Sequence, residues 1–268
     1  MPPLVDIHCH LLAGLDDGPR TDDDALAMCR MAYEEGTRLI SATAHQSETW
    51  PEVTPERIRR ATRRLQLQLA EAQIELSVFP CGEVMVHPEL EESCAVGRLL
   101  TIADAGRYLL VEMPHHLYVN LGGMVESLCA TGVRPILAHP ERCPDLLHGS
   151  GEIEGLIEAG CLVQVSTHSI TEPGSRRDER ALRSWFERDI PHVLGSDGHS
   201  PRRRPPRIRA AYERVTRWAG SDVADRVARA NGAAILRGLP LCVPEPKAAR
   251  RRWFWRTKTE THARPQRP

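Results

Sequence analysis

The segment Leu4-Val5-Asp6-Ile7-His8-Cys9-His10 opens the chain with a β-branched, apolar run that ends in two histidines. Its composition predicts a strand over residues 4–9 that is buried on both faces. Side chains two residues apart in a strand point to the same side, so we expect His8 and His10 to project together and Cys9 to face away. Two imidazoles in this arrangement can share one metal ion. The pair alone is a weak indication, and its meaning depends on the rest of the chain.

Six further apolar runs follow, and amphipathic segments separate them. The additional predicted strands span residues 39–44, 76–84, 108–113, 134–138, 161–166 and 192–195. The predicted helices span residues 22–35, 55–72, 121–131, 151–159 and 179–188, with two more near 208–219 and 222–230. Strands that alternate with helices in this way are typical of a parallel sheet.

Local signals at the ends of the helices support these boundaries. Thr21 or Asp22 can cap the first helix, and Thr54 precedes a proline at the first position of the second helix. Three glycines stand between a helix and the next strand, where a left-handed residue ends many helices. These glycines are Gly36, Gly132 and Gly160.

The alternation predicts an α/β fold with one domain. No linker divides the run, so one closed or nearly closed barrel is favoured over two open sheets. We expect this barrel to occupy residues 1–240 and a basic, disordered tail to occupy residues 241–268, which include Arg250-Arg251-Arg252 and Trp253-Phe254-Trp255. A basic and aromatic tail of this kind would contact an anionic membrane only weakly.

Acidic and histidine residues recur where the predicted strands end. In barrels of parallel strands, catalytic residues come from the carboxyl ends of several strands. Six of the seven predicted strands end in such a residue; after the first strand, the candidates are His45, Glu83, Glu112, His139, Asp197 and His199. Each one alone has a structural explanation, such as a helix cap or an ion pair with arginine. A ring of them on one face favours a metal site, because buried acids and imidazoles are costly unless paired or metal-bound.

The mixture of carboxylates and imidazoles favours manganese, iron or zinc over an all-thiolate zinc site. Such ions lower the pKa of a bound water and can neutralise a phosphate. The chain lacks a Gly-rich P-loop, a GxGxxG motif after the first strand, a GxSxG elbow and a Cys-x5-Arg signature. These absences argue against nucleotide-dependent transferases, dehydrogenases, serine hydrolases and cysteine phosphatases.

The composition limits the classes of binding partner and the cellular compartment that we expect. The 35 Lys+Arg and 36 Asp+Glu residues nearly balance, and aromatic residues make up only 4%, so a nucleic-acid partner is not expected. The first residues lack the pattern of a signal peptide, and no apolar stretch approaches the roughly 20 residues of a membrane span. The eight cysteines are scattered, which predicts reduced thiols in the cytoplasm.

Asp6-Ile7-His8-Cys9-His10, followed by Asp16-Asp17-Gly18-Pro19, resembles the opening of the polymerase-and-histidinol-phosphatase (PHP) superfamily. Within it, Ala138-His139-Pro140-Glu141-Arg142 and Ser196-Asp197-Gly198-His199 resemble the bacterial tyrosine phosphatases of capsule and exopolysaccharide loci, of CpsB/CapC type. The resemblance runs from about residue 5 to residue 239. It implies a distorted (β/α)7 TIM-like barrel of the PHP type with a site for three metal ions, usually manganese.

The resemblance also assigns residues by matching motif. The implied ligands are His8, His10, Glu83 and Asp197 for the first ion, Glu83 and His139 for the second, and Asp17, His45 and His199 for the third. Glu112 would be the general acid, and Arg142 and Arg204 would bind the phosphate, which suits the planar fork of a guanidinium group. The implied substrate is phosphotyrosine on a protein, such as a bacterial tyrosine kinase that controls polysaccharide export.

Three departures from the family pattern leave the substrate preference open. Gln46-Ser47 follows His45 where the family often has further basic or histidine residues. Ser166-Thr167-His168 replaces the more usual asparagine-containing turn, and His115-His116 adds two histidines. We expect His168, His115 and His116 to face the substrate or solvent.

The same ligands also fit a small-molecule phosphatase, such as a histidinol phosphatase, or a nuclease-like phosphoesterase. A metal-binding or kinase-binding module without catalytic activity is the third alternative. The sequence does not indicate an oligomeric state.

Overall fold

The computed structural model of the chain describes residues 2–114, 117–149 and 151–247. Seven parallel strands form one sheet in which each strand pairs with its neighbour in sequence. The strands are β1 (Leu4–His10), β2 (Thr37–Gln46), β3 (Ser77–Met85), β4 (Tyr108–Glu112), β5 (Arg134–Ala138), β6 (Leu162–Ser166) and β7 (Val193–Gly195). The predicted single barrel of seven strands is confirmed.

Backbone hydrogen bonds close the sheet beside the carboxyl ends of β1 and β7. The Asp197 N–H donates to the His8 carbonyl at 2.7 Å, and the His10 N–H donates to the Gly198 carbonyl at 2.8 Å. An isolated parallel bridge joins Cys9 to Gly198 at the same place. The first and last strands therefore meet where the predicted ligands lie.

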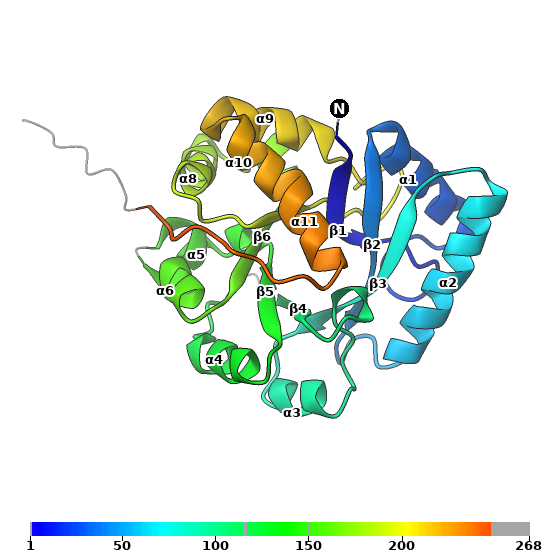
Figure 1. The fold of residues 1–268 in the computed structure, drawn as a ribbon, viewed down its shortest axis with the longest axis horizontal. Coiled ribbons are helices and arrows are strands. Elements are labelled where there is room, and N and C mark those ends of the chain that lie inside the picture. Colours follow the sequence, from blue (N-terminus) through cyan, green and yellow to red (C-terminus); the bar gives the residue numbers. More distant parts are fainter. Residues whose placement is uncertain (1, 115–116, 150, 248–268) are drawn as a thin grey trace, which may run out of the picture.

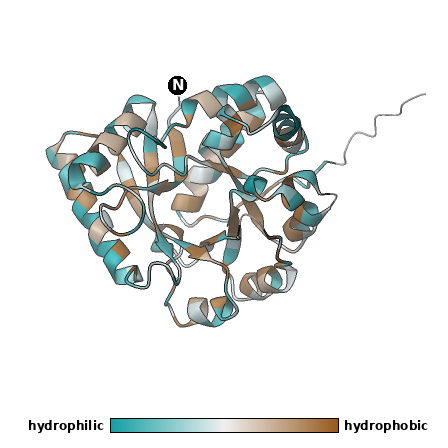
Figure 2. Cartoon of the chain, turned by 180° about the vertical axis from the view of Figure 1, so that it is seen from behind, coloured by the Kyte–Doolittle hydropathy of each residue, from teal (hydrophilic) through white to brown (hydrophobic). Residues whose placement is uncertain are grey.

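Helices surround the barrel (Figure 1). The longer ones are α1 (Asp22–Glu34), α2 (Pro55–Glu71), α4 (Gly122–Ala130), α6 (Glu152–Glu158), α8 (Arg176–Glu187) and α9 (Arg209–Ala219). Short helices and turns are α3 (Leu90–Ala95), η1 (Ile102–Asp104), η2 (Pro140–Arg142), α5 (Pro144–His148) and α7 (Thr167–Thr171). Figure 2 shows the hydrophobic colour gathered on the strands, with hydrophilic stretches along the surrounding helices, as expected for amphipathic helices packed on a buried sheet.

The predicted helix ends agree with the structure in most places. The Thr21 hydroxyl accepts the Asp24 N–H at the start of α1, and Thr54 caps α2 in the same way before Pro55. Gly36, Gly132 and Gly160 all have positive φ angles, as predicted for residues that end helices.

Two elements extend two or more residues beyond one of their predicted ends. Helix α8 begins at Arg176 because the Ser175 hydroxyl accepts the N–H groups of Arg177 and Asp178. Strand β2 runs on to Gln46, so that His45 lies within the strand instead of after it. In both cases hydrogen bonding extends an element beyond its apolar core.

The final helices close the amino end of the barrel. The helix predicted near 222–230 is α10 (Ser221–Asp225) followed by a π-helical turn, η3 (Arg226–Ala230), and it continues as α11 (Asn231–Leu236). Ile235 and Leu236 pack with Val5 and Val193, which lie near the starts of their strands, and α11 lies across this end in Figure 1. A Cβ at Gly232 would lie 2.8 Å from a Val5 methyl, so only glycine permits this approach. The site must lie at the opposite end.

Residues 241–247 continue along the barrel after α11. The Lys247 N–H donates to the Arg188 carbonyl, and the Arg188 Nε donates to the Lys247 carbonyl, both at 2.9 Å. Lys247 Nζ also lies 2.5 Å from the carboxylate of Asp189. The first part of the predicted tail therefore contacts the end of α8, and the basic-aromatic remainder lies outside the described residues. In the described ranges, no helix combines the length and the apolar character that a bilayer span requires.

Candidate metal centre

The Glu83 side chain, near the end of β3, lies at the centre of a cluster of histidines. Its Oε2 is 3.1 Å from the Nε2 atoms of both His8 and His10 and 3.3 Å from Nδ1 of His45. Its Oε1 is 3.1 Å from Nε2 of His139. Residues from β1, β2, β3 and the end of β5 thus meet at one carboxylate, at the carboxyl ends of the strands.

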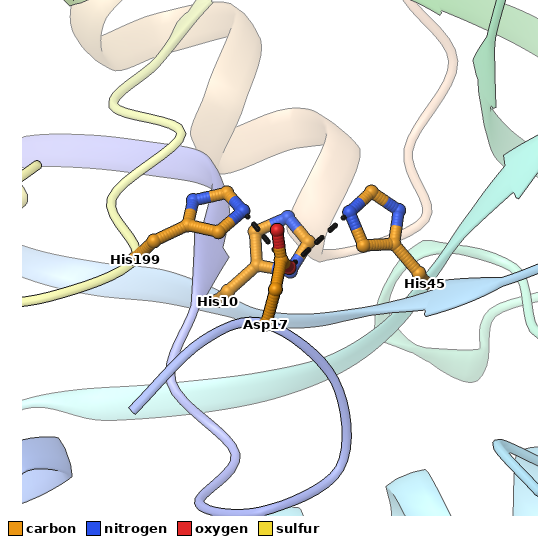
Figure 3. Close-up of side chains that lie close together, drawn as sticks. All are labelled: His10, Asp17, His45 and His199. Carbon is orange, nitrogen blue, oxygen red and sulfur yellow. Dashed lines mark ion pairs between the residues drawn. The ribbon is translucent and has the colours of Figure 1, made fainter. Parts of the chain in front are cut away.

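Two further carboxylates complete the cluster. Asp197 Oδ1 lies 3.4 Å from Nε2 of His8 and 3.5 Å from Nδ1 of His199. Asp17 Oδ1 lies 3.3 Å from Nε2 of His199 and 3.5 Å from Nε2 of His45, as the dashed lines of Figure 3 mark. The structure therefore brings all eight predicted ligands together, although they come from positions as far apart in the sequence as His8 and His199.

The spacing of these atoms suits metal ions. Ions with ligand bonds of about 2.1 Å hold neighbouring ligand atoms roughly 3 Å apart, and the contacts above are 3.1–3.5 Å. Four subsets have their ligand atoms within 4.8 Å of one another: His10, Asp17, His45 and His199; His8, His10 and Asp197; His8, Glu83 and His139; and His45, Glu83 and Glu112. Because several residues belong to two subsets, the cluster fits several ions that share bridging ligands.

The electrostatics of the cluster fit the same role. Burial would raise the pKa of Glu83, but the charge of His8 and the hydrogen bonds from His10 and His139 hold this pKa well below its ordinary value. Burial also opposes ionisation of Asp17, yet His199 brings the pKa of Asp17 down to about 2. For His10, burial lowers the pKa, whereas Asp16 and Glu83 raise it more, so the net pKa is well above the ordinary value. Glu83 and Asp17 are therefore ionised, and a bound cation would take the place of a proton on His10.

Two residues without a predicted role orient the histidine rings. Asp16 Oδ2 lies 2.7 Å from Nδ1 of His10 and also accepts the backbone N–H of His45 at 3.0 Å. Gln164 Oε1 lies 2.9 Å from Nδ1 of His8. Both contacts turn the Nε2 atom of the ring toward the cluster, as outer-sphere partners of metal ligands do. A signal existed for each, since Asp16 precedes Asp17 in the quoted motif and Gln164 interrupts an apolar strand.

Asp6 joins the strands that carry the site. Its Oδ1 accepts the N–H of His8 at 3.1 Å and the N–H of Ser196 at 2.9 Å. Burial raises the pKa of Asp6 to about 6, although these hydrogen bonds oppose the increase. The side chain therefore fixes the end of β1 against the segment that follows β7.

Two of the candidate ligands have left-handed backbone conformations. The φ angles are 33° for His139 and 52° for Asp197, each just after the end of a strand. A residue with a side chain adopts this region at a cost of the order of 1–3 kcal/mol. In this conformation the side chains of both residues reach the cluster, where His139 contacts Glu83 and Asp197 contacts His8.

The residues expected to handle the phosphate lie at the edge of the cluster. Both Arg142 and Arg204 donate from Nη2 to Oδ2 of Asp197. Arg142 also donates to the Ser166 hydroxyl at 3.2 Å. Glu112 lies 3.7 Å from His45 Nδ1. Because Glu112 also belongs to one subset of possible ligands, its position fits either a general acid or a metal ligand.

The departures from the family pattern have different structural outcomes. Gln46 is buried away from the cluster, where its Oε1 accepts the Leu100 N–H at 2.8 Å and its Nε2 donates to the Arg98 carbonyl at 3.2 Å. His168 is half exposed, as expected, and lines a cavity next to Arg142. His115 and His116 lie outside the described residues.

Comparison with known proteins agrees with this architecture. The tyrosine-protein phosphatase YwqE of Bacillus subtilis is 27% identical over 250 residues, which cover 93% of this chain and 98% of that protein. The tyrosine-protein phosphatase CpsB of Streptococcus pneumoniae is 26% identical over 81% of this chain and 92% of its own length. A solved structure superposes with a TM-score of 0.86 at 27% identity and covers 92% of this chain and all of its own; it is described among the crystal structures of YwqE and CpsB, "unique metal-dependent tyrosine phosphatases".

The family described as "Capsular polysaccharide synthesis, CpsB/CapC" matches residues 4–237. This range contains every residue of the cluster and both arginines, and it ends with the helix that closes the barrel. The chain therefore belongs to the CpsB/CapC family.

Proposed function

We propose that this chain is a metal-dependent phosphatase that removes phosphate from tyrosine side chains of a protein. The observation that carries the proposal is the convergence of eight imidazole and carboxylate side chains, with two guanidinium groups at their edge. The names of the relatives support tyrosine phosphate over a small-molecule substrate such as histidinol phosphate.

We assign about three ions to the four overlapping ligand subsets, with Mn²⁺ as the first choice and iron or zinc as alternatives. His8, His10, Glu83 and Asp197 would hold the first ion, Glu83 and His139 the second, and Asp17, His45 and His199 the third. When bound, these ions lower the pKa of a coordinated water and neutralise charge on the phosphate. Asp16 and Gln164 keep the rings of His10 and His8 in the orientation that binding requires.

The other residues act on the substrate. Arg142 and Arg204 bind phosphate oxygens. Their Nη2 groups lie at the edge of the cluster, beside the carboxylate of Asp197, where a phosphate bound to the metal ions would be within their reach. In the transition state the phosphoryl group carries spread negative charge, which these guanidinium groups stabilise. Water attacks phosphorus in line and forms the new phosphorus–oxygen bond, while Glu112 gives a proton to the phenolic oxygen. The bond to the phenolic oxygen breaks, so that tyrosine leaves as the neutral phenol and the phosphoryl group leaves as inorganic phosphate.

The substrate we favour is a bacterial tyrosine kinase of the polysaccharide export machinery, and the compartment is the cytoplasm. The family description supports a role in capsule synthesis. All eight cysteines are unpaired, and five of them are buried, which suits a reducing compartment.

The direct test is turnover by the full chain loaded with Mn²⁺. We expect release of phosphate from p-nitrophenyl phosphate and from a phosphotyrosine peptide, with a higher kcat/KM for the peptide than for histidinol phosphate. His8→Ala and Asp197→Ala should each lower kcat/KM by about a hundredfold or more, since outer-sphere changes alone cost about 10–100-fold. His87→Ala, at a partly exposed histidine outside the cluster, is the matched control. Losses below about tenfold in both variants, or a preference for histidinol phosphate, would contradict the proposal.

Glu112→Gln distinguishes the two roles open to that residue. If Glu112 is the general acid, the variant loses more activity on phosphotyrosine than on p-nitrophenyl phosphate, because p-nitrophenolate is the better leaving group and needs less protonation. The expected difference is about a hundredfold, the lower end of general-acid contributions. Equal losses on both substrates, together with a lower metal content by elemental analysis, would show that Glu112 is a ligand.

A further inference from the structure

A cavity of about 350 Å³ lies beside the phosphate-binding side of the cluster. It is formed by η2 and α5, which follow β5, and by α7 and the start of α8, which follow β6. Arg142 lines this cavity, while its Nη2 reaches Asp197 in the cluster. One guanidinium group is therefore shared between the candidate phosphate site and the side cavity, which is large enough for a side chain of a bound polypeptide.

Aliphatic carbons line part of the side cavity. Leu147 and Leu182 are buried, and Pro144 and Pro173 lie beside them. Such a lining suits the methylene stem of a long side chain.

The charged groups of the side cavity are mostly acidic. Glu141, Glu172 and Asp178 line it. Among the described residues of its wall there is one arginine, Arg142, which forms an ion pair with Asp197. The two histidines on the wall already have acidic neighbours: His148 Nε2 is 2.8 Å from Asp178 Oδ1, and His168 Nδ1 is 3.9 Å from Glu172. When both histidines are neutral, the three carboxylates outnumber the one guanidinium group, and the wall of the side cavity carries a net negative charge.

Glu141 adds a separate indication that this region can accept a further cation. Its side chain is 5% exposed, and Oε1 accepts the Ser166 N–H at 3.0 Å. Its Oε2 is buried and has no hydrogen-bond partner among the described residues. A buried carboxylate oxygen without a partner is costly, so a positive charge in the side cavity would stabilise it.

We infer that the side cavity binds a lysine or arginine side chain that flanks the phosphotyrosine in the substrate. The inference rests on the proposed function, because the phosphate held by Arg142 places the neighbouring residues of the peptide next to the cavity. An extended chain advances about 3.3 Å per residue, so a residue one to three positions from the phosphotyrosine can reach it. The aliphatic stem packs on the leucines, and the cationic head lies among the carboxylates. The site thereby selects phosphotyrosines in a basic context.

The test compares phosphotyrosine peptides that are identical except for their flanking positions, which are lysine, norleucine or glutamate. For the Mn²⁺-loaded full chain, we expect kcat/KM to be about fivefold higher with lysine than with norleucine, which corresponds to ~1 kcal/mol. Glutamate should give the lowest value. In Glu172→Gln and in Asp178→Asn, the ratio of lysine to norleucine should fall toward one. The ratio is the readout, so a general loss of activity cancels.

Glu187→Gln is the matched control, because Glu187 is a half-exposed acid of the same helix α8 that does not line the side cavity. This variant should keep the ratio of the unmodified chain. Turnover of all peptides at one rate, or a ratio unchanged in both cavity variants, would overturn the inference and leave the proposed function standing. Absence of turnover with every phosphotyrosine peptide would overturn the proposed function and, with it, the inference.

Discussion

Four imidazoles surround the carboxylate of Glu83, which is 1% exposed. A buried carboxylate is costly without compensating charge. Here the compensation comes from residues of separate strands. Two of the rings have a further polar partner behind them, because Asp16 contacts His10 and Gln164 contacts His8. The orientation of the histidine rings at the candidate metal centre therefore depends on Asp16 and Gln164, which are not themselves among the predicted ligands.

Asp16→Asn tests this dependence. The variant removes the negative charge beside His10 Nδ1, so we expect the affinity for Mn²⁺ to fall by about 10–100-fold. The fold should remain, since the asparagine carbonyl can still accept the His45 N–H. Isothermal titration of the metal-free chain measures the change. Asp23→Asn, at an exposed position of α1, should bind Mn²⁺ like the unmodified chain; equal affinities for both variants would contradict a role for Asp16.

His192 makes the stability depend on pH. Its ring is buried, Nδ1 accepts the Val163 N–H at 2.9 Å, and burial together with nearby arginines lowers its pKa to about 3. The unfolded chain, with a histidine pKa near ~6.5, binds a proton that the folded chain does not bind between these two values. Stability should therefore fall as the pH decreases through this window, by an amount of the order of a few kcal/mol.

Urea unfolding at a series of acidic pH values measures this effect. His192→Gln can still accept the Val163 N–H but cannot take up a proton, so its stability should change less between the two pKa values. His168→Gln, at a half-exposed histidine, serves as the control. A pH dependence as steep in His192→Gln as in the unmodified chain would assign the effect to other groups.

At the scale of elements, the helix starts are set by single side chains. Helices α1, α2 and α8 each begin after a residue whose hydroxyl accepts backbone N–H groups of the first turn. Sequence patterns identified Thr21 and Thr54, because an acidic first turn or a proline follows them. Ser175 was missed because arginines follow it, although its cap adds a turn to α8 and positions Asp178 at the side cavity.

Ser175→Ala should destabilise the chain by about 1 kcal/mol, as the loss of an N-cap usually does. Urea denaturation should show a lower midpoint with an unchanged slope. Ser184→Ala, within the same helix and outside its caps, should have a smaller effect because alanine favours the helix interior. Equal midpoints for both variants would mean that the cap does not limit the stability of α8.

At the scale of the whole molecule, the candidate metal centre connects the first strand of the barrel with the segment that follows the last. Its residues lie in or directly after β1, β2, β3, β5 and β7, so bound ions would link strands that otherwise meet through backbone hydrogen bonds. The opposite end of the barrel is held by α11 and its apolar contacts. Hydrophobic packing thus stabilises the amino end of the barrel, whereas interactions between charged groups stabilise the carboxyl end.

Removal of metal with a chelator should lower the thermal stability, and Mn²⁺ should restore it. A ligand at a hundred times its Kd stabilises a folded chain by about 2.7 kcal/mol per site. Because the pKa of His10 is raised, protons compete with the ions, and the affinity for Mn²⁺ should increase as the pH rises. Scanning calorimetry with and without Mn²⁺ measures the shift in Tm. An identical shift in His8→Ala would show that the stabilising ions bind elsewhere.

By itself, the sequence determined the alternation of strands and helices, the single barrel, and the set of residues at the strand ends. These features are local, because buried strands impose apolar runs and their carboxyl ends fall at one rim. Only the tertiary structure decided which atoms meet there. The contact between His8 and Gln164 spans 156 positions, Gln46 is buried in a structural role, and α11 closes the far end of the barrel. The packing of elements that are distant in the chain determines such contacts, and the pattern within one segment contains no information about it.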